Sequence, residues 1–408
     1  MIRTAPSAVE LVAMVAALMS MNALAIDVML PALPAIGQDL GVVEANQTQY
    51  VVIAFALGMG FGQLVFGPLS DRFGRRPVLL ISIGLYALFG LGCALPGSFG
   101  QLVGFRMAQG LASAGGRAIS VSIVRDLHRG NAMARIMSLV VVVFMVVPIA
   151  APSLGWVVLQ FGSWRLIFWG LVGFGLLLGC WIWARLPETH APANRRPFEF
   201  KSIATAYSEV VRQPDSLRYT LASGFVFGCL FGFISSSEQL FSIYGRQDSF
   251  PLYFAGVAAS MALAAFANAW LVERLGARRI SGGAATAFVI VQVTLTLLLN
   301  SQGSDGLQGF SLLYGGLLLA FFCVGLMGAN FNALALEPLG HIAGTASAAV
   351  GFASTAMASV LGGLVGQQFD GTPVPLSMGF AVLATAAWLT VNLRGRPRAP
   401  VVAVPSRG

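Results

Sequence analysis

Twelve long apolar segments, each near the length of a membrane-crossing helix, are the feature that most restricts how this chain can fold. A helix needs about 20 apolar residues to cross the hydrocarbon core of a bilayer. Hydrophobic residues make up 57% of the chain and charged residues only 10%, whereas soluble domains usually carry about 25% charged residues. We therefore predict an all-α membrane protein whose spans lie near 9–31, 47–69, 77–96, 100–124, 135–160, 164–185, 218–243, 251–272, 280–299, 309–336, 343–367 and 374–393.

The basic residues follow the spans in a way that predicts orientation. The formal net charge is +8, and of the 24 Lys and Arg residues, Arg165 and Arg246 fall on one side of the predicted membrane and Arg106 and Arg117 fall inside spans. The other twenty lie in alternate loops and at the two termini. Loops rich in Lys and Arg face the cytoplasm, so both termini are predicted to be cytoplasmic. This distribution sets topology and does not predict a nucleic-acid partner.

A polar stretch from Arg185 to Arg218 divides the spans into six and six. A short repeat supports this division, because Asp71, Arg72, Gly74 and Arg76 recur 202 residues later as Glu273, Arg274, Gly276 and Arg278. Related halves around a central cavity are typical of secondary transporters. We predict two pseudo-symmetric six-helix bundles, 1–186 and 218–408, joined by a cytoplasmic linker at 187–217.

Three motifs resemble those of the major facilitator superfamily. Residues 67–77, GPLSDRFGRRP, resemble its motif A, and residues 102–110, LVGFRMAQG, resemble motif B. Residues 148–155, PIAAPSLG, resemble motif C, the antiporter signature, with Ala151 where glycine is usual. The resemblance implies the major facilitator fold, a conformational role for Gly67, Asp71, Arg72, Gly74, Arg75 and Arg76, and an antiporter role for Pro148, Pro152 and Gly155.

Three further stretches resemble the bicyclomycin-resistance (Bcr/CflA) branch of the drug:proton antiporters: residues 25–31, 124–127 and 330–341. This resemblance implies a monomeric, multi-pass protein of the bacterial inner membrane that exports small molecules such as drugs or antibiotics in exchange for protons. We predict no enzyme activity, because the predicted spans hold no cluster of His, Cys and carboxylate residues, and we predict no cofactor and no metal. The alternatives are a dedicated exporter of one metabolite, such as an amino-acid derivative, a nucleoside or a siderophore, and a membrane sensor that transports nothing.

Two helix-packing features accompany the motifs. The resemblance implies that Asp71 latches the two halves where span 11 begins, since a carboxylate is favoured near a helix N-terminus. Glycine pairs on spans 2 and 11, at residues 58 and 62 and at residues 362 and 366, predict close packing against neighbouring helices.

Ionisable residues inside spans are functional candidates, because a charge at the bilayer centre needs a partner or a wet cavity. Asp27 and Arg106 fall in the outer half of the first bundle, where we expect them to pair, either as a coupling site or as a static ion pair. Arg117 shares the face of Arg106 and either lines the cavity or snorkels. Glu238 follows three serines and either lines a wet face or lies at the outer mouth. The predicted proton-coupling residues are Asp27, Arg106 and Glu238, and the predicted substrate cavity adds Arg117, Ser236 and Asn330.

Overall fold

The described chain is helical throughout. The structure, a computed structural model, describes residues 6–128, 130–195 and 200–392. Within these ranges twelve helices have 19 or more residues, and two shorter α-helices, α2 (Leu33–Asp39) and α8 (Phe200–Arg212), accompany them. The long helices are α1 (Ala8–Asp27), α3 (Tyr50–Phe73), α4 (Arg75–Ala94), α5 (Phe99–Leu127), α6 (Gly130–Phe161), α7 (Arg165–Arg185), α9 (Pro214–Ser242), α10 (Phe250–Leu275), α11 (Ala277–Gln302), α12 (Gly306–Leu336), α13 (Ala343–Gly366) and α14 (Val374–Asn392).

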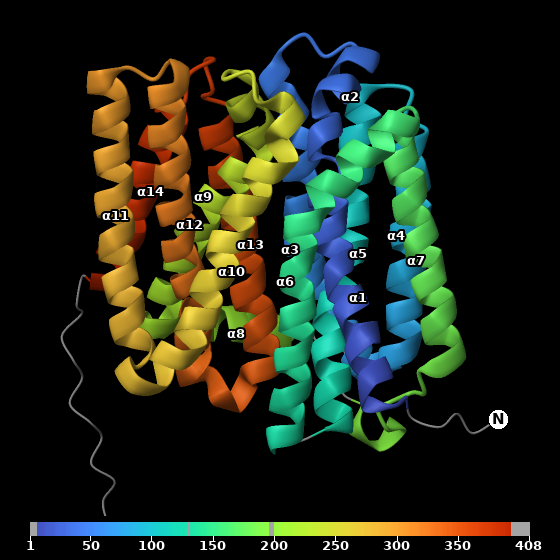
Figure 1. Ribbon diagram of the computed structural model, residues 1–408. Coiled ribbons are helices and arrows are strands. Elements are labelled where there is room, and N and C mark those ends of the chain that lie inside the picture. Colours follow the sequence, from blue (N-terminus) through green and yellow to red (C-terminus); the bar gives the residue numbers. More distant parts are fainter. Residues whose placement is uncertain (1–5, 129, 196–199, 393–408) are drawn as a thin grey trace, which may run out of the picture.

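The long helices stand side by side in two groups (Figure 1). Helices α1 and α3–α7 form the first group, and α9–α14 form the second. Helix α3 packs along α13 and α6 packs along α10, and these two pairs make the main contacts between the groups. Helix α8 lies across one end of the interface, where it contacts α13. Below, the two groups are called the first half and the second half.

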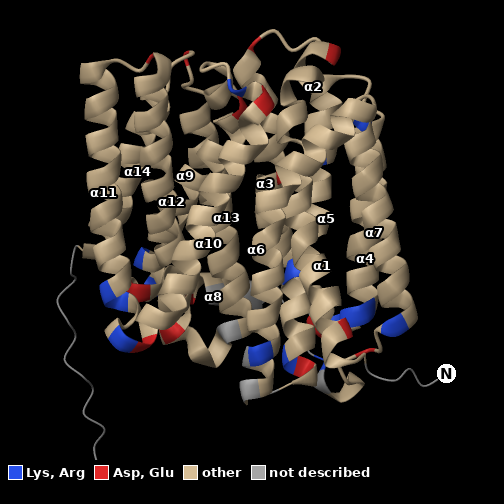
Figure 2. Cartoon of the chain, viewed as in Figure 1, with Lys and Arg blue, Asp and Glu red and all other residues tan. Residues whose placement is uncertain are grey.

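Most Lys and Arg residues gather at one end of the bundle, as Figure 2 shows. We call it the basic end; the other end, where α2 lies, is the opposite end. Helices α1 and α9 run from the basic end to the opposite end, and α5 runs in the reverse direction. Asp27 is the last residue of α1 and therefore lies in the half of the bundle nearer the opposite end.

In the described part of the chain, eleven helices are both long and apolar enough to cross a membrane, and α5 is the long helix missing from that set. With 29 residues α5 is longer than most of the others. It carries Arg106, Gln109 and Arg117, which lower its mean hydropathy. Arg106 and Gln109 are completely buried inside the protein. The all-α membrane architecture predicted from the sequence is confirmed, and its twelfth span is a helix whose Arg106 and Gln109 side chains face protein.

Glycines form the tight connections of the 202-residue repeat and the close contacts between α3 and α5. Gly74 alone separates α3 from α4, and Gly276 alone separates α10 from α11, with φ angles of +102° and +78°. Such angles favour glycine, so the 202-residue repeat places the same tight connection in each half. The predicted close packing at Gly58 and Gly62 is also confirmed, because a Cβ there would lie 2.0 and 2.2 Å from carbonyl oxygens of α5.

Candidate functional site

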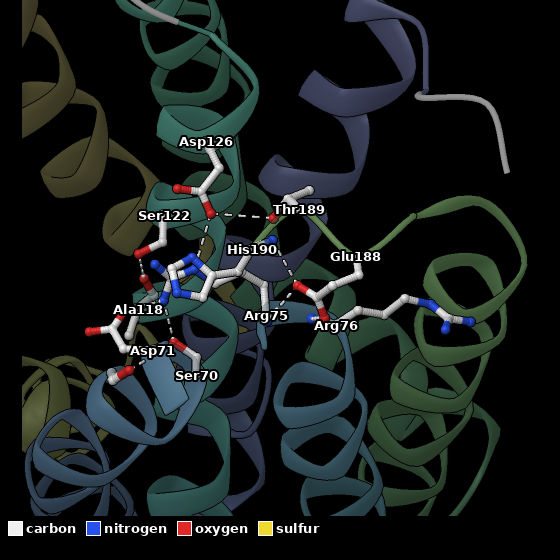
Figure 3. A network of polar contacts seen from close by, with 11 residues as sticks. Ser70, Asp71, Arg75, Arg76, Ala118, Ser122, Asp126, Glu188, Thr189 and His190 are labelled. Carbon is white, nitrogen blue, oxygen red and sulfur yellow. Dashed lines mark hydrogen bonds and ion pairs between the residues drawn. The ribbon is translucent and has the colours of Figure 1, made fainter. Parts of the chain in front are cut away.

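Arg75 is the centre of a polar network at the basic end of the first half (Figure 3). Its side chain is buried and forms ion pairs with Asp71, at 2.5 Å, and with Asp126, at 3.1 Å. It also donates a hydrogen bond to the Ser70 hydroxyl at 2.7 Å. A buried arginine is tolerated only when its charge and its donors are satisfied, so this cluster ties together the ends of α3, α4 and α5.

Glu188 is a member of this network that the motif comparison does not single out. Its carboxylate accepts the backbone N–H groups of Arg75, at 2.9 Å, and of Arg76, at 3.2 Å, the first two residues of α4 (Figure 3). Unpaired N–H groups at a helix N-terminus are stabilised by an anion. The chain following α7 is thereby fixed to the start of α4, which a sequence comparison of adjacent residues cannot reveal.

The predicted contact between Asp71 and the start of span 11 is absent from this conformation. In the described part of the chain, Asp71 bonds Arg75, and no hydrogen bond joins it to α13. The Asp71 side chain is 40% exposed. The motif A residues therefore organise one half here and do not latch it to the other.

Gly155 of motif C brings α6 against α1 beside Asp27. A Cβ at Gly155 would lie 1.8 Å from the carbonyl oxygen of Val28, which is far closer than any side chain can approach. Pro152, one turn earlier, is also buried, and Pro148 is half-buried. The motif thus sets the closest approach of α6 to the residue that follows Asp27.

Asp27 is buried, with 4% of its surface exposed. Among the described residues no side chain forms an ion pair with it, and no hydrogen bond to its carboxylate is found. An ionised carboxylate without partners in an apolar site is costly, whereas a protonated one costs much less. The surroundings of Asp27 therefore suit a group that gains and loses a proton.

Arg106 does not form the ion pair with Asp27 that the sequence predicts. Its completely buried guanidinium donates instead to the carbonyl oxygens of Val51, at 3.0 Å, and Ala25, at 2.9 Å, and to the Gln109 side chain at 2.8 Å. The Phe55 ring lies 4.3 Å from the guanidinium carbon. Arg106 thus joins α5 to α3 and to α1, two residues before Asp27, through backbone acceptors that no pattern of side chains can predict.

Arg117 differs from Arg106 although the same helix carries both. Its side chain is exposed, and within the described ranges it forms neither an ion pair nor a hydrogen bond. The neighbouring Gly116 packs against α1, where a Cβ would lie 3.2 Å from the Leu18 carbonyl oxygen. The structure therefore places an accessible, unpaired cation on an inner helix.

Glu238 is half-buried near the end of α9, and no partner for its carboxylate is found in the described part of the chain. The serines before it do not form the expected wet face. Ser236 is completely buried, and its hydroxyl donates to the carbonyl oxygen of Gly232 in its own helix at 2.6 Å. Ser236 therefore faces the protein interior in this structure, and its place in the substrate cavity stays a prediction.

Asn330 is likewise not free to bind a substrate here. It is 4% exposed, and its amide exchanges hydrogen bonds of 2.7 and 3.3 Å with the amide of Asn268 on α10. Such paired amides hold helices together in an apolar medium. Asn330 joins α12 to α10 in this structure, and its place in the substrate cavity stays a prediction.

Four amide side chains close the opposite end between the two halves, and sequence reasoning missed all of them. Gln49 donates to Gln239 of α9 at 2.7 Å and to the Gly366 carbonyl oxygen of α13 at 3.1 Å. Asn46 donates to the Phe369 carbonyl oxygen at 2.7 Å, and Gln367 donates back to the Asn46 carbonyl oxygen at 2.7 Å. We call Asn46, Gln49, Gln239 and Gln367 the amide cluster.

The sequence profile of the Major Facilitator Superfamily matches residues 15–366. The chain belongs to the Major Facilitator Superfamily. It is 32% identical over 392 residues to the bicyclomycin resistance protein homolog of Haemophilus influenzae, a match that covers 91% of this chain and 94% of that relative. The multidrug resistance protein D of Escherichia coli is 25% identical, with 95% and 96% covered. The predicted relationship to the bicyclomycin-resistance branch is confirmed.

Solved structures support the same fold. The D-xylose-proton symporter covers 94% of this chain, with 96% of its own chain aligned, at 15% identity and a TM-score of 0.71. The human organic anion transporter MFSD10 aligns over 95% of this chain and 100% of its own, at 20% identity and a TM-score of 0.61. The twelve-helix arrangement is therefore that of a superfamily transporter, a class that moves small molecules across membranes.

Proposed function

We propose that this transporter exports drug-like small molecules across the bacterial cytoplasmic membrane in exchange for protons. The observation that carries the proposal is Asp27, a buried carboxylate in a membrane span without a partner in the described structure. Relatives named for bicyclomycin and multidrug resistance support the substrate class. An exporter dedicated to one metabolite would use the same helices and differ in the breadth of its substrates.

Asp27 is the proposed coupling carboxylate, with Arg106 tuning it and Glu238 as the second candidate. Arg106 donates a hydrogen bond to the Ala25 carbonyl oxygen of α1. Because Ala25 lies two residues before Asp27, this bond holds the positive charge of Arg106 near the proposed coupling carboxylate. A proton arriving from outside would neutralise Asp27, and substrate arriving from the cytoplasm would favour its release. Each charge moved through the membrane potential supplies about 2.3 kcal/mol per 100 mV.

Alternating access requires that the two ends open in turn. The amide cluster joins the halves at the opposite end, and at the basic end the ion pairs of Arg75, Arg185 and Arg278 each join residues of one half. These contacts support a state that is closed at the opposite end. Toward the basic end α3 and α13 also approach each other, where Pro68 and Thr345 border one small pocket. By the positive-inside rule we propose that the basic end and both termini are cytoplasmic, and that the exporter works as a monomer.

The decisive experiment measures substrate-induced proton release and thermal stability on purified protein. We expect Asp27→Asn to remain folded and to release no protons when a transported drug is added. Arg106→Gln should lose stability, because two hydrogen bonds to other helices and one within α5 disappear, and the double variant should stay inactive. Glu238→Gln, the matched carboxyl control, should still release protons.

Three results would contradict this assignment. Normal proton release by Asp27→Asn, or active transport by the double variant, would move the coupling role to Glu238. Loss of proton release in Glu238→Gln alone would do the same. Failure of the wild-type protein to release protons with any of a broad panel of transported drugs would refute proton exchange itself.

A further inference from the structure

The faces of α5 show where Arg117 points. Gly116 packs against α1, Ala114 packs against α3, and the Ala112 carbonyl oxygen accepts a hydrogen bond from α4. Successive residues of a helix are rotated by about 100° about its axis. Around the axis of α5, Arg117 therefore lies about 100° from Gly116 in one direction and about 60° from Ala114 in the other, and about 140° from Ala112. Its side chain is therefore directed between α1 and α3, away from α4. Helix α4 lies on the side remote from the second half (Figure 1), so Arg117 faces the second half.

The depth of Arg117 excludes a simple surface position. It lies ten residues before the end of α5 at the basic end, which corresponds to about 15 Å along the helix axis. The Cα–Cβ bonds of a helix tilt toward its N-terminus, and the N-terminus of α5 is at the opposite end. The Cα–Cβ bond of Arg117 is thus inclined away from the basic end, which is against the direction that snorkelling would need.

No acidic group of the described chain neutralises this cation. Gly116 is level with Leu18 of α1, and Asp27 is nine residues farther along that helix, about 14 Å away along its axis. Arg106, eleven residues earlier on nearly the same face, has its donors taken by carbonyl and amide oxygens. A charged group at membrane depth needs a partner or water, and Arg117 is exposed instead of being packed against protein groups.

We propose that Arg117 binds the anionic group of the transported molecule, so that the chain prefers substrates carrying a carboxylate, phosphate or sulfonate. This inference rests on the proposed export function and names the substrate class of its cavity. The guanidinium presents donors in a planar fork that matches such oxyanions. Because Arg117 and Asp27 are far apart along the bundle, the anion site and the proton site are separate, and substrate binding does not block protonation directly.

The test uses two pairs of compounds that differ by one negative charge: chloramphenicol succinate with chloramphenicol, and nalidixic acid with its ethyl ester. Binding to the purified, detergent-solubilised full chain is measured by equilibrium dialysis. Arg117→Gln removes the charge, Arg117→Lys keeps it without the fork, and Arg279→Gln removes an exposed charge at the basic end as the matched control.

In the wild type we expect each acid to bind more tightly than its neutral partner. Losing a charge-assisted hydrogen bond costs about ten- to hundredfold in affinity, so Arg117→Gln should lose that factor for the acids and little for the neutral compounds. Arg117→Lys should keep part of the preference, and Arg279→Gln all of it. The proposal is overturned if no acid binds the wild type better than its partner, or if the preference survives in Arg117→Gln.

Transport measurements distinguish a failure of the proposed role of Arg117 from a failure of the proposed export function. Export of chloramphenicol is measured in inside-out vesicles from cells that produce each variant. Retained export of the neutral drug by Arg117→Gln, together with a lost preference for the acids, supports both conclusions. Proton-coupled export in the wild type without any preference for acids would leave the proposed function intact and refute the role of Arg117.

Discussion

Gly155→Ala is the substitution whose effect the structure predicts most directly. The new Cβ would lie 1.8 Å from the carbonyl oxygen of Val28 and 2.8 Å from its carbon. Unstrained carbon–oxygen contacts lie at about 3.3–3.6 Å. Helices α1 and α6 must therefore separate by about 1.5 Å at this level, because the obstacle is backbone and cannot rotate away.

The expected cost follows from overpacking. Extra methyl groups in a packed interior cost about 1–3 kcal/mol, and a clash with a fixed carbonyl places Gly155→Ala at the upper limit, about 3 kcal/mol. The separation occurs beside Asp27, so transport should fall as well. Gly173→Ala on α7 is the matched control, because no atom lies within 4 Å of its new Cβ. Removing a helix glycine there should be neutral or stabilising by up to about 1 kcal/mol.

The assay is the free energy of unfolding of the purified protein, measured by titration with sodium dodecyl sulfate in mixed micelles. Drug transport in proteoliposomes is measured on the same preparations. If Gly155→Ala is as stable as Gly173→Ala and transports at the wild-type rate, motif C does not act through this helix contact. Reduced transport with unchanged stability would refute the steric reasoning and leave only a conformational role.

Two further substitutions test the two ends of the molecule. Asp71→Asn should leave folding nearly intact, because Arg75 keeps its other partners, and should sharply lower transport in proteoliposomes; a normal rate would make motif A a purely structural cluster. Gln49→Ala removes two bonds between the halves and should lengthen the distance between spin labels at positions 43 and 370 at the opposite end. An unchanged distance distribution would show that the amide cluster does not hold this end closed.

Local sequence determines much of this fold. The apolar segments predict the helices, because span length and hydropathy depend on neighbouring residues alone. The tight connections at Gly74 and Gly276 follow for the same reason, since their positive φ angles favour glycine. The boundaries of the two halves, at residues 186 and 218, stay a prediction.

The candidate site is harder to predict because its partners are far apart in the sequence. Asn330 meets Asn268 across 62 residues, and Gln49 meets Gly366 across 317. Such pairs depend on how each helix is rotated about its axis, and rotation is set by packing. Ser236 is an example, because it is completely buried. A rotation of α9 by about a quarter turn, the angle between neighbouring residues, would change which side chains face the protein interior. Arg106 finds backbone acceptors, which every residue offers and no pattern distinguishes.

Helix α5 shows how polarity inside a membrane protein can be interpreted. Among the described long helices, α5 is the one that is not apolar enough to count as a membrane span. A charge in contact with lipid would cost several kcal/mol. Arg106 avoids that cost through carbonyl, amide and aromatic partners, while Arg117 is exposed and has no such partners among the described residues. The first solution fixes α5 to α1 beside the proposed proton site, and the second leaves a charge for a ligand. The residues that make α5 a poor membrane span are thus the residues on which coupling and substrate choice are proposed to depend.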